Sequence, residues 1–185
     1  MTFTECLSLI KSDLNMFPNI NFGVVKYFFF NASFKFTVWL RLGSYLRSKK
    51  GLFRILYGVV FLIHKHNQYL TGIQVRIETK IEGGLRFQHF SGIVVNEGCE
   101  IGRNCLIFQN VTIGASSSGI PRIGNNVIIC AGAVIIGNVY IGDNVIVGAN
   151  SVVTHNIPSN TIVAGIPARV ISENSQSKMN DYMYH

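Results

Sequence analysis

A six-residue repeat is the feature that most restricts how this chain can fold. Apolar residues recur at every sixth position in three uninterrupted runs, over 75–87, 95–113 and 123–153. Ten of the thirteen hexads carry Gly or Asn three residues after the apolar one, and these two residue types adopt left-handed backbone angles at low cost. Because an α-helix has a period of 3.6 residues, the pattern predicts a short strand and a turn in each hexad.

Thirteen hexads in phase predict a solenoid. A plain sandwich of short strands would not keep a six-residue phase over so many units. Three hexads per coil give a triangular prism whose coils stack like paired strands, about 4.8 Å apart. The expected fold is therefore mainly β, with a parallel β-helix over roughly 73–158 and the first residue of each hexad inside.

The charge of the chain is concentrated before the repeats. Residues 1–86 hold twelve Lys and Arg against four acids, whereas residues 87–185 hold four against five. The same part is aromatic, with 15 of the 21 aromatic residues before Thr71 and helix-like stretches around 24–47 and 52–69. We therefore expect three parts. They are a basic, aromatic helical segment at 1–72, a β-helix domain at 73–171 and a flexible C-terminal tail at 172–185.

Two interpretations of the basic segment stay open. A pair of basic, aromatic, amphipathic helices is typical of a surface that rests on an anionic membrane or docks a partner. The other interpretation is a helical cap that packs on the β-helix and in a trimer, with solvated charges. Nucleic acid is a poor fit, because the chain has no nucleic-acid-binding motif and the basic stretch is too apolar. No apolar run reaches the ~18–20 residues of a spanning helix, and four Cys without a cleavable signal favour the cytoplasm.

The hexad phase breaks twice, and breaks in a regular scaffold are common places for function. The first break stretches one repeat to eight residues between 87 and 95, and the second stretches one to ten residues between 113 and 123. Either break is also compatible with a tolerated surface insertion. His89 lies in the first break, at the third position of its hexad.

The hexad phase also predicts an outward column of side chains. On one of the three faces the third positions are His89, Gln109, Ala131 and Ala149. Three coil steps separate the first from the last, about 14 Å. We expect His64 and His66 to be solvated or at an interface, and His155 to be a surface residue. The repeat cysteines are expected to fill the core, at Cys99, Cys105 and Cys130. None of them has the spacing of a metal site.

Two motifs resemble the serine acetyltransferase branch of the hexapeptide acyltransferases. The sequence HFSGIVV at 89–95 precedes NVTIG at 110–114, and VAGIPAR at 163–169 resembles the end of that family's β-helix. The resemblance covers residues ~72–171. It implies a left-handed parallel β-helix of hexapeptide repeats and an O-acetyltransferase that uses acetyl-CoA. It also implies a homotrimer with its sites between neighbouring prisms, and no metal.

The same resemblance implies roles for particular residues. His89 corresponds to the general base, which suits a hydroxyl that must lose its proton as it attacks a thioester. Ala131 and Ala149 correspond to the wall of the CoA groove, and a column of ~14 Å suits an extended pantetheine arm. Backbone N–H groups near Gly114 are candidates for the oxyanion site, and Arg169 completes the acetyl-CoA-binding set.

The sequence departs from the serine enzymes around this histidine. Gln74 stands where the family usually has an acid that orients the histidine, Gln88 replaces an Asp, and Ile120 replaces a second His. Burying the ammonium or the carboxylate of serine without a charged partner costs several kcal/mol. The candidates for the acceptor pocket are therefore uncharged, namely Gln74, Gln88, Phe90 and Gln109.

These departures favour a sugar acceptor. Short sugar O-acetyltransferases of capsule, exopolysaccharide and lipopolysaccharide O-antigen pathways have a similar layout, a short basic helical lead before such a β-helix. We therefore expect acetyl transfer from acetyl-CoA to a sugar or lipid-linked glycan hydroxyl in bacterial surface polysaccharide biosynthesis. The expected location is the cytoplasm or the inner face of its membrane. The alternatives are serine O-acetyltransferase of cysteine biosynthesis and a non-catalytic β-helix scaffold.

Overall fold

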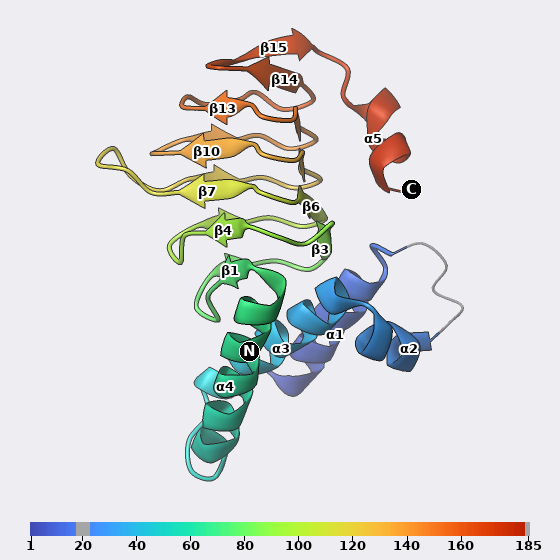
Figure 1. The fold of residues 1–185 in the computed structure, drawn as a ribbon, viewed down its shortest axis with the longest axis vertical. Coiled ribbons are helices and arrows are strands. Elements are labelled where there is room, and N and C mark those ends of the chain that lie inside the picture. Colours follow the sequence, from blue (N-terminus) through green and yellow to red (C-terminus); the bar gives the residue numbers. More distant parts are fainter. Residues whose placement is uncertain (18–22, 184–185) are drawn as a thin grey trace.

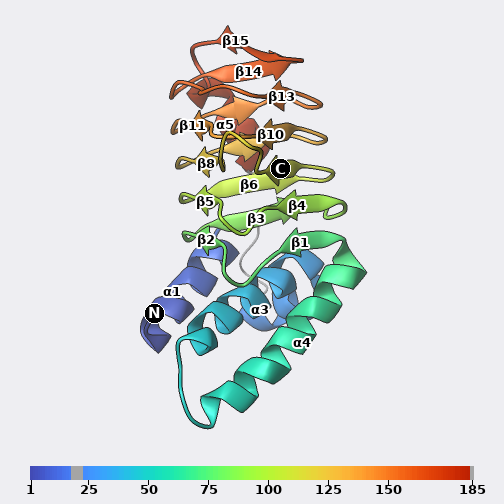
Figure 2. The same cartoon turned by 90° about the vertical axis from the view of Figure 1, so that its left-hand side faces the viewer.

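The computed structural model describes residues 1–17 and 23–183, which form a β-solenoid standing on a group of helices (Figure 1). The helices are α1 (Phe3–Leu14), α2 (Gly23–Phe30), α3 (Ala32–Arg47), α4 (Phe53–Thr71) and α5 (Gln176–Met183). The first four precede the solenoid and lie at its base, whereas α5 follows it and lies along its side (Figures 1 and 2).

Three sheets form the three sides of the solenoid. Sheet A contains β1 (Ile73–Val75), β4 (Ile93–Val95), β7 (Thr112–Gly114), β10 (Val134–Ile136) and β13 (Val152–Val153). Sheet B contains β2 (Lys80–Ile81), β5 (Glu100–Ile101), β8 (Arg122–Ile123) and β11 (Tyr140–Ile141). Sheet C contains β3 (Leu85–Gln88), β6 (Cys105–Phe108), β9 (Ile128–Ile129), β12 (Ile146–Val147), β14 (Ile162–Gly165) and β15 (Ala168–Ser172). All pairs are parallel except β14 with β15, which confirms the predicted parallel β-helix.

Hexad positions have the roles that the period predicts. Ile107, Ile129 and Val147 stack in register in sheet C and are fully buried. The turn residues have positive φ, from 53° to 58° at five Asn of the repeats. Their side chains also form a ladder along one corner, where each amide donates to the next Asn at 2.9 Å, through Asn104, Asn126, Asn144 and Asn160.

The N-terminal segment is helical, as predicted, but its helices begin and end elsewhere. The expected stretch at 24–47 is two helices separated at Asn31, whose side chain accepts from the backbone N–H of Phe34 at 2.9 Å. The helix α1 was not predicted from the sequence, although Thr2 and Glu5 form a capping box at its start, which is a recognisable sequence signal.

A buried ion pair fastens these helices to the first coil. Asp13 of α1 accepts from Arg41 of α3 at 2.9 Å, and both side chains are buried. The other carboxylate oxygen of Asp13 accepts from the backbone N–H groups of Gly84 and Leu85 at 2.9 and 2.8 Å. Arg41 in turn donates to the carbonyl of Glu82 at 2.6 Å. The helices are thus a cap on the solenoid, which agrees with the second interpretation of the basic segment.

His64, expected to be solvated or at an interface, is buried at the contact between α4 and the first coil. His64 is 2% exposed, and its Nε2 lies 2.9 Å from the carbonyl oxygen of Val75, which also accepts from Gln68. Burial lowers the pKa of His64. A histidine four residues from a glutamine on one helix face is buried here because α4 turns its polar side toward the solenoid.

The segment expected to be a flexible tail, 172–185, contains the helix α5 (Gln176–Met183). Helix α5 lies across the outer side of sheet C, where Met179 packs with Leu106, Ile128 and Ile146. Among the described residues, no helix combines the length and the apolarity needed to cross a bilayer.

Candidate functional site

His89 occupies the corner at which the chain turns from sheet C into sheet A. β3 ends at Gln88 and β4 begins at Ile93, so the first break in the hexad phase is this corner. His89 is exposed and has φ 53°. All other positive-φ residues in the described part of the chain are Asn or Gly. A histidine in this conformation is uncommon, and such backbone outliers cluster at functional sites.

The corner is held firmly despite its extra length. The carbonyl of Ser91 accepts from the N–H of Asn110 in the next coil at 2.8 Å. Gly92 has φ 60°, and a Cβ there would lie 2.5 Å from the side-chain oxygen of Asn110. Only glycine fits so close to Asn110, and this contact with the next coil holds the backbone that carries His89 in place.

The predicted column exists in the structure. Gln88 pairs with Phe108 and Ile107 with Ile129, so Gln109, Ala131 and Ala149 follow one another above His89. Gln109 and Ala131 are half-buried and Ala149 is exposed. The two alanines leave the upper part of this corner without bulky side chains.

The imidazole of His89 makes no side-chain hydrogen bond within the described part of the chain, and its ring centroid lies 6.3 Å from that of Phe108. The Oε1 atom of Gln109 is buried and also has no hydrogen-bond partner among the described residues. A buried amide oxygen without a partner is costly. The imidazole of His89 and the amide oxygen of Gln109 can therefore each form a hydrogen bond with a ligand or with one another.

A cavity of about 280 Å³ opens beside His89. Its described lining residues are Phe17, Tyr27, Asn31, Ser33, Arg86, Phe87, Gln88, His89 and Phe90. Two of the acceptor-pocket candidates, Gln88 and Phe90, thus lie with His89 as expected. We call this cavity the acceptor hollow. Phe17, α2 and the start of α3 close one side of it, and β3 with the His89 corner closes the other.

Arg86 is a residue of this site that was not predicted from the sequence. It lies on the outer side of β3, is 4% exposed, and donates to the carbonyl of Met16 at 2.8 Å and to Oε1 of Gln88 at 2.5 Å. Its guanidinium also lies over the ring of Phe17, 5.1 Å from the centroid. The sequence signal that could have found it is its position two residues before Gln88, on the same side of a strand.

Three other candidates lie elsewhere in the chain. Gln74 is the exposed central residue of β1, the first strand of sheet A, and pairs with Val94. Gly114 ends β7, four residues beyond Asn110 and hence about 13 Å from the His89 corner. Arg169 is in the hairpin at the far end of the solenoid and donates to its own neighbour's carbonyl. A single chain therefore does not bring these three residues to His89.

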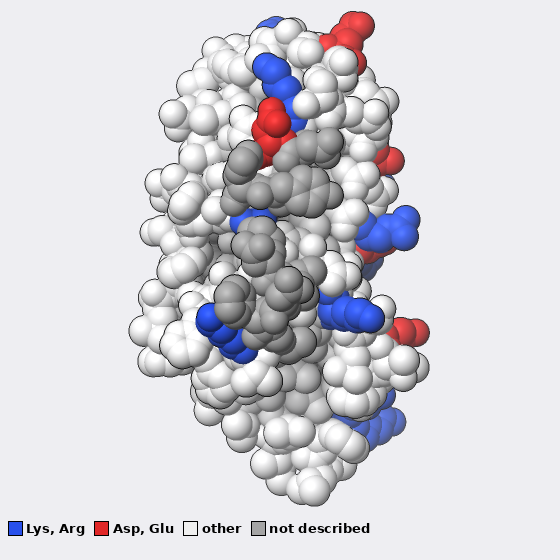
Figure 3. Space-filling view, turned by 90° about the vertical axis from the view of Figure 1, so that its right-hand side faces the viewer, with Lys and Arg blue, Asp and Glu red and all other residues white. Residues whose placement is uncertain are grey.

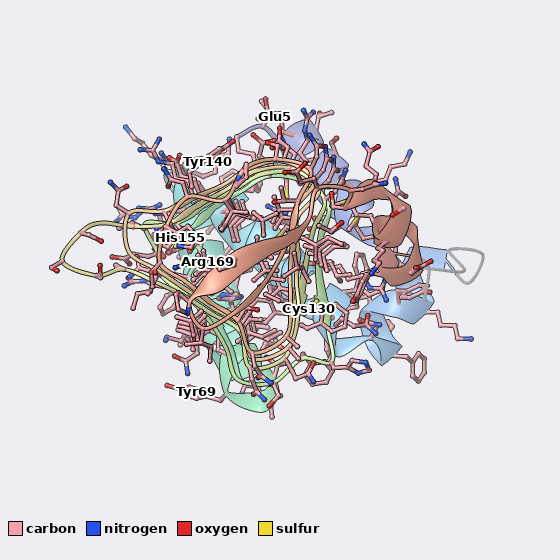
Figure 4. The ribbon with its side chains drawn as sticks, turned by 90° about the horizontal axis from the view of Figure 1, so that it is seen from above. Glu5, Tyr69, Cys130, Tyr140, His155 and Arg169 are labelled. Atoms are coloured by element: carbon pink, nitrogen blue, oxygen red, sulfur yellow. The ribbon has the colours of Figure 1, made fainter. Side chains whose placement is uncertain are left out.

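The cysteines are structural, as expected. Cys99 and Cys105 point into the solenoid, where burial raises their thiol pKa values to about 11 and about 12. Cys130 is buried on the outer side of sheet C, toward α5 (Figure 4). Protonated, buried thiols are poor nucleophiles. No group of three or more His, Cys, Asp or Glu among the described residues is placed to hold a metal ion.

Comparison with known sequences identifies the repeat. Residues 120–155 match the family model described as bacterial transferase hexapeptide (six repeats). The solenoid is a hexapeptide-repeat β-helix. A serine acetyltransferase of Staphylococcus epidermidis is 39% identical over 116 residues, which are 60% of this chain and 54% of that protein. One of Staphylococcus xylosus is 38% identical over 124 residues, 65% of this chain and 57% of that protein. The chain thus spans little more than half the length of these relatives.

The solved structures that are similar to this chain include several serine acetyltransferases. A serine acetyltransferase in complex with cysteine has a TM-score of 0.76 at 25% identity, over 92% of this chain and 71% of that one. Another, in complex with CoA, has a TM-score of 0.76 at 26% identity, over 91% and 71% of the two chains. The soybean serine acetyltransferase apoenzyme has 0.76 at 28% identity, over 91% and 69%.

These comparisons overturn the prediction of a sugar acceptor. The two staphylococcal relatives and the three solved structures are all named serine acetyltransferases, and none of the five is named for polysaccharide, capsule or lipopolysaccharide synthesis. The sugar hypothesis relied on three departures, at Gln74, Gln88 and Ile120. Missing groups at three positions do not exclude an acceptor when another residue provides the charge.

Proposed function

We propose that this chain is a serine O-acetyltransferase with acetyl-CoA as donor. The observation that carries the proposal is an exposed imidazole at the head of a column of small side chains, in a chain 39% identical to serine acetyltransferases. Two similar structures are titled as complexes with CoA or coenzyme A, which supports the donor.

In this reaction the hydroxyl oxygen of serine attacks the thioester carbon of acetyl-CoA. The neutral imidazole of His89 takes the hydroxyl proton as the new C–O bond forms. When the tetrahedral intermediate collapses, the C–S bond breaks and the imidazolium returns its proton to the CoA sulfur. The products are O-acetylserine and CoA. The free Oε1 of Gln109 is suited to accept from the second ring N–H and so to hold the tautomer that this step needs.

The complete site needs a second chain. Gly114, the candidate for the oxyanion donors, lies at the C-terminal end of β7, whereas His89 precedes the N-terminal end of β4. A neighbouring prism would bring the Gly114 of one chain close to the His89 of another. A Cβ on Gly114 would make only ordinary contacts, at 3.7 and 3.9 Å, which leaves its outer side open to such a neighbour. We therefore propose a homotrimer with each site between two chains, as is common in closed symmetric oligomers.

The direct test is thiol release from acetyl-CoA with and without L-serine. We expect CoA release that depends on L-serine and the formation of O-acetylserine, detected by mass spectrometry. Light scattering under the same conditions should give three times the chain mass of 20.5 kDa. Release that L-serine does not stimulate would contradict the proposed acceptor.

Tryptophan in the column should block the donor. If the pantetheine arm lies along Ala131 and Ala149, then Ala149→Trp should raise the KM for acetyl-CoA at least about tenfold, because an indole fills the space of the arm. The fold should be retained, since Ala149 is exposed. Val170→Trp, on the exposed side of β15, is a matched control. An unchanged KM in Ala149→Trp and in Ala131→Trp would remove the column from the donor site.

Helix α4 supports a second proposal, about where the enzyme works. Its buried side is largely polar, with His64, Asn67, Gln68 and Thr71, whereas the side facing away from the solenoid is apolar. The outward apolar residues repeat at helical spacing and are 48–80% exposed, as Leu52, Ile55, Leu56, Val59, Leu62 and Leu70. An amphipathic helix whose apolar side faces outward is typical of a surface that binds a membrane or another protein.

We propose that an anionic membrane surface covers this side of α4. Exposed basic residues flank the apolar side, at Lys50, Arg54 and Lys65, and no acid occurs between Leu14 and Ile77. Like charges along the rim disfavour a second copy as the cover, whereas anionic lipids gain about 1 kcal/mol for each basic residue near them. We therefore propose that the enzyme works at the inner face of the cytoplasmic membrane.

Vesicle flotation tests this proposal. The protein should float with phosphatidylglycerol vesicles, much less with phosphatidylcholine vesicles, and less at high salt. Ile55→Asp with Val59→Asp should abolish flotation, while Ile171→Asp, an equally exposed apolar residue on β15, should leave it unchanged. Failure to float with either lipid, or flotation that the paired substitution does not reduce, would contradict a membrane role for α4.

A further inference from the structure

The acceptor hollow has a fixed cation in its wall. We infer that Arg86 binds the carboxylate of the acceptor, so that the substrate class is a small hydroxy acid or hydroxyamino acid. The inference rests on the proposed function, to which it adds the group that the chain uses to recognise its acceptor.

Position along the strand is the first argument. Arg86 and Gln88 alternate with the inward Leu85 and Phe87, so both point to the outer side of sheet C. The chain then turns at His89. His89 is the third residue after Arg86, which limits their Cα separation to about 10 Å. Both side chains open on the same hollow, so one small molecule can contact both.

The second argument is electrostatic. The described lining of the hollow contains Arg86 and no acidic side chain. Burial lowers the pKa of Arg86, the direction expected when a guanidinium has lost much of its hydration. A desolvated guanidinium gains from a carboxylate, which it binds through two parallel hydrogen bonds. In Figure 3, basic and acidic side chains lie scattered over the described part of the face that carries α2 and α5.

The third argument is that Arg86 is held in place before any acceptor arrives. The carbonyl of Met16, the amide oxygen of Gln88 and the ring of Phe17 all contact its guanidinium. Such support fixes the cation relative to the backbone of β3, which also leads to His89. A preorganised cation near the base fixes the hydroxyl of a carboxylate-bearing acceptor with little loss of entropy.

Neutral polar groups complete the hollow. Tyr27, Asn31 and Gln88 line it. The amide oxygens of Asn31 and Gln88 already accept from Phe34 and Arg86, and the second lone pair of each is suited to an ammonium group. This arrangement differs from a clamp built at positions 88 and 120, where the sequence lacks charged residues. It explains how the chain could accept serine without those residues.

The test compares two acceptors that differ only in the carboxylate, L-serine and L-serinamide. In the wild-type protein we expect a KM for L-serine at least about tenfold below that for L-serinamide. Arg86→Gln should raise the KM for L-serine about 10- to 100-fold and change that for L-serinamide less than about threefold. Arg86→Lys keeps the positive charge but loses the planar guanidinium, so its KM for L-serine should lie between those of the wild-type protein and Arg86→Gln. Arg103→Gln, at an exposed arginine, is the control.

The outcomes separate the two proposals. No turnover of L-serine by the wild-type protein would contradict the proposed function itself. Turnover of L-serine with equal KM values for both acceptors, or an equal loss for both in Arg86→Gln, would overturn the role of Arg86 and leave the proposed function standing. The KM for acetyl-CoA and the melting temperature verify that the variants fold. If Arg86→Gln does not fold, the proposal is tested by the ratio of the two KM values in the wild-type protein and by the KM of Arg86→Lys for L-serine.

Discussion

Replacement of His89 by alanine is expected to lower kcat for acetyl transfer by about 10²–10⁴-fold, the usual contribution of a general base. His89 is exposed and makes no side-chain hydrogen bond among the described residues. Its removal should therefore leave the solenoid, the melting temperature and the KM for acetyl-CoA nearly unchanged. Steady-state kinetics of thiol release with L-serine measure the loss.

His155→Ala is the matched control for this experiment. His155 is also an exposed histidine on a turn of the solenoid, but it lies far from the acceptor hollow, toward sheets A and B (Figure 4). Its replacement should leave kcat within about twofold of the wild-type value. A His89→Ala protein with full activity would show that the base is another group and would remove His89 from the proposed mechanism.

Local pattern was enough to predict the solenoid and the column. Each coil repeats the same pattern of an inward aliphatic residue and a turn residue, so one atypical residue does not change the prediction for the other coils. The phase that puts Ile107 and Ile129 inside also puts Gln109 and Ala131 outside. The break in the phase correctly marked the corner that carries His89, because a regular coil leaves no room for the extra residues.

Contacts between distant segments were not predictable in this way. Arg86 is part of the site because Met16 and Phe17, some 70 residues earlier, fold back over β3. His64 is buried because α4 turns its polar side toward β1. The prediction of a sugar acceptor, which the similarity to serine acetyltransferases contradicts, considered charge only at positions that a sequence motif marks.

The largest expected loss of stability comes from Asp13→Asn. This substitution leaves the buried guanidinium of Arg41 without its charged partner, and breaking a buried ion pair on one side costs about 3–5 kcal/mol. The amide nitrogen that replaces one carboxylate oxygen accepts no hydrogen bond, so the Asn side chain can accept either from Arg41 Nε or from the N–H groups of Gly84 and Leu85, but not from both. For a chain of this size the melting temperature should fall by about 6–20 °C, as measured by differential scanning calorimetry.

Two further variants serve as controls for the Asp13→Asn experiment. Glu100→Gln breaks an exposed pair with Lys80 and should change the melting temperature little, because exposed ion pairs contribute little. Asp13→Leu combined with Arg41→Met removes both charges and should recover part of the loss. If Asp13→Asn melts like the wild-type protein, the ion pair does not fasten the cap to the solenoid. Since the cap closes one side of the acceptor hollow, a loosened cap should also raise the KM for L-serine more than that for acetyl-CoA.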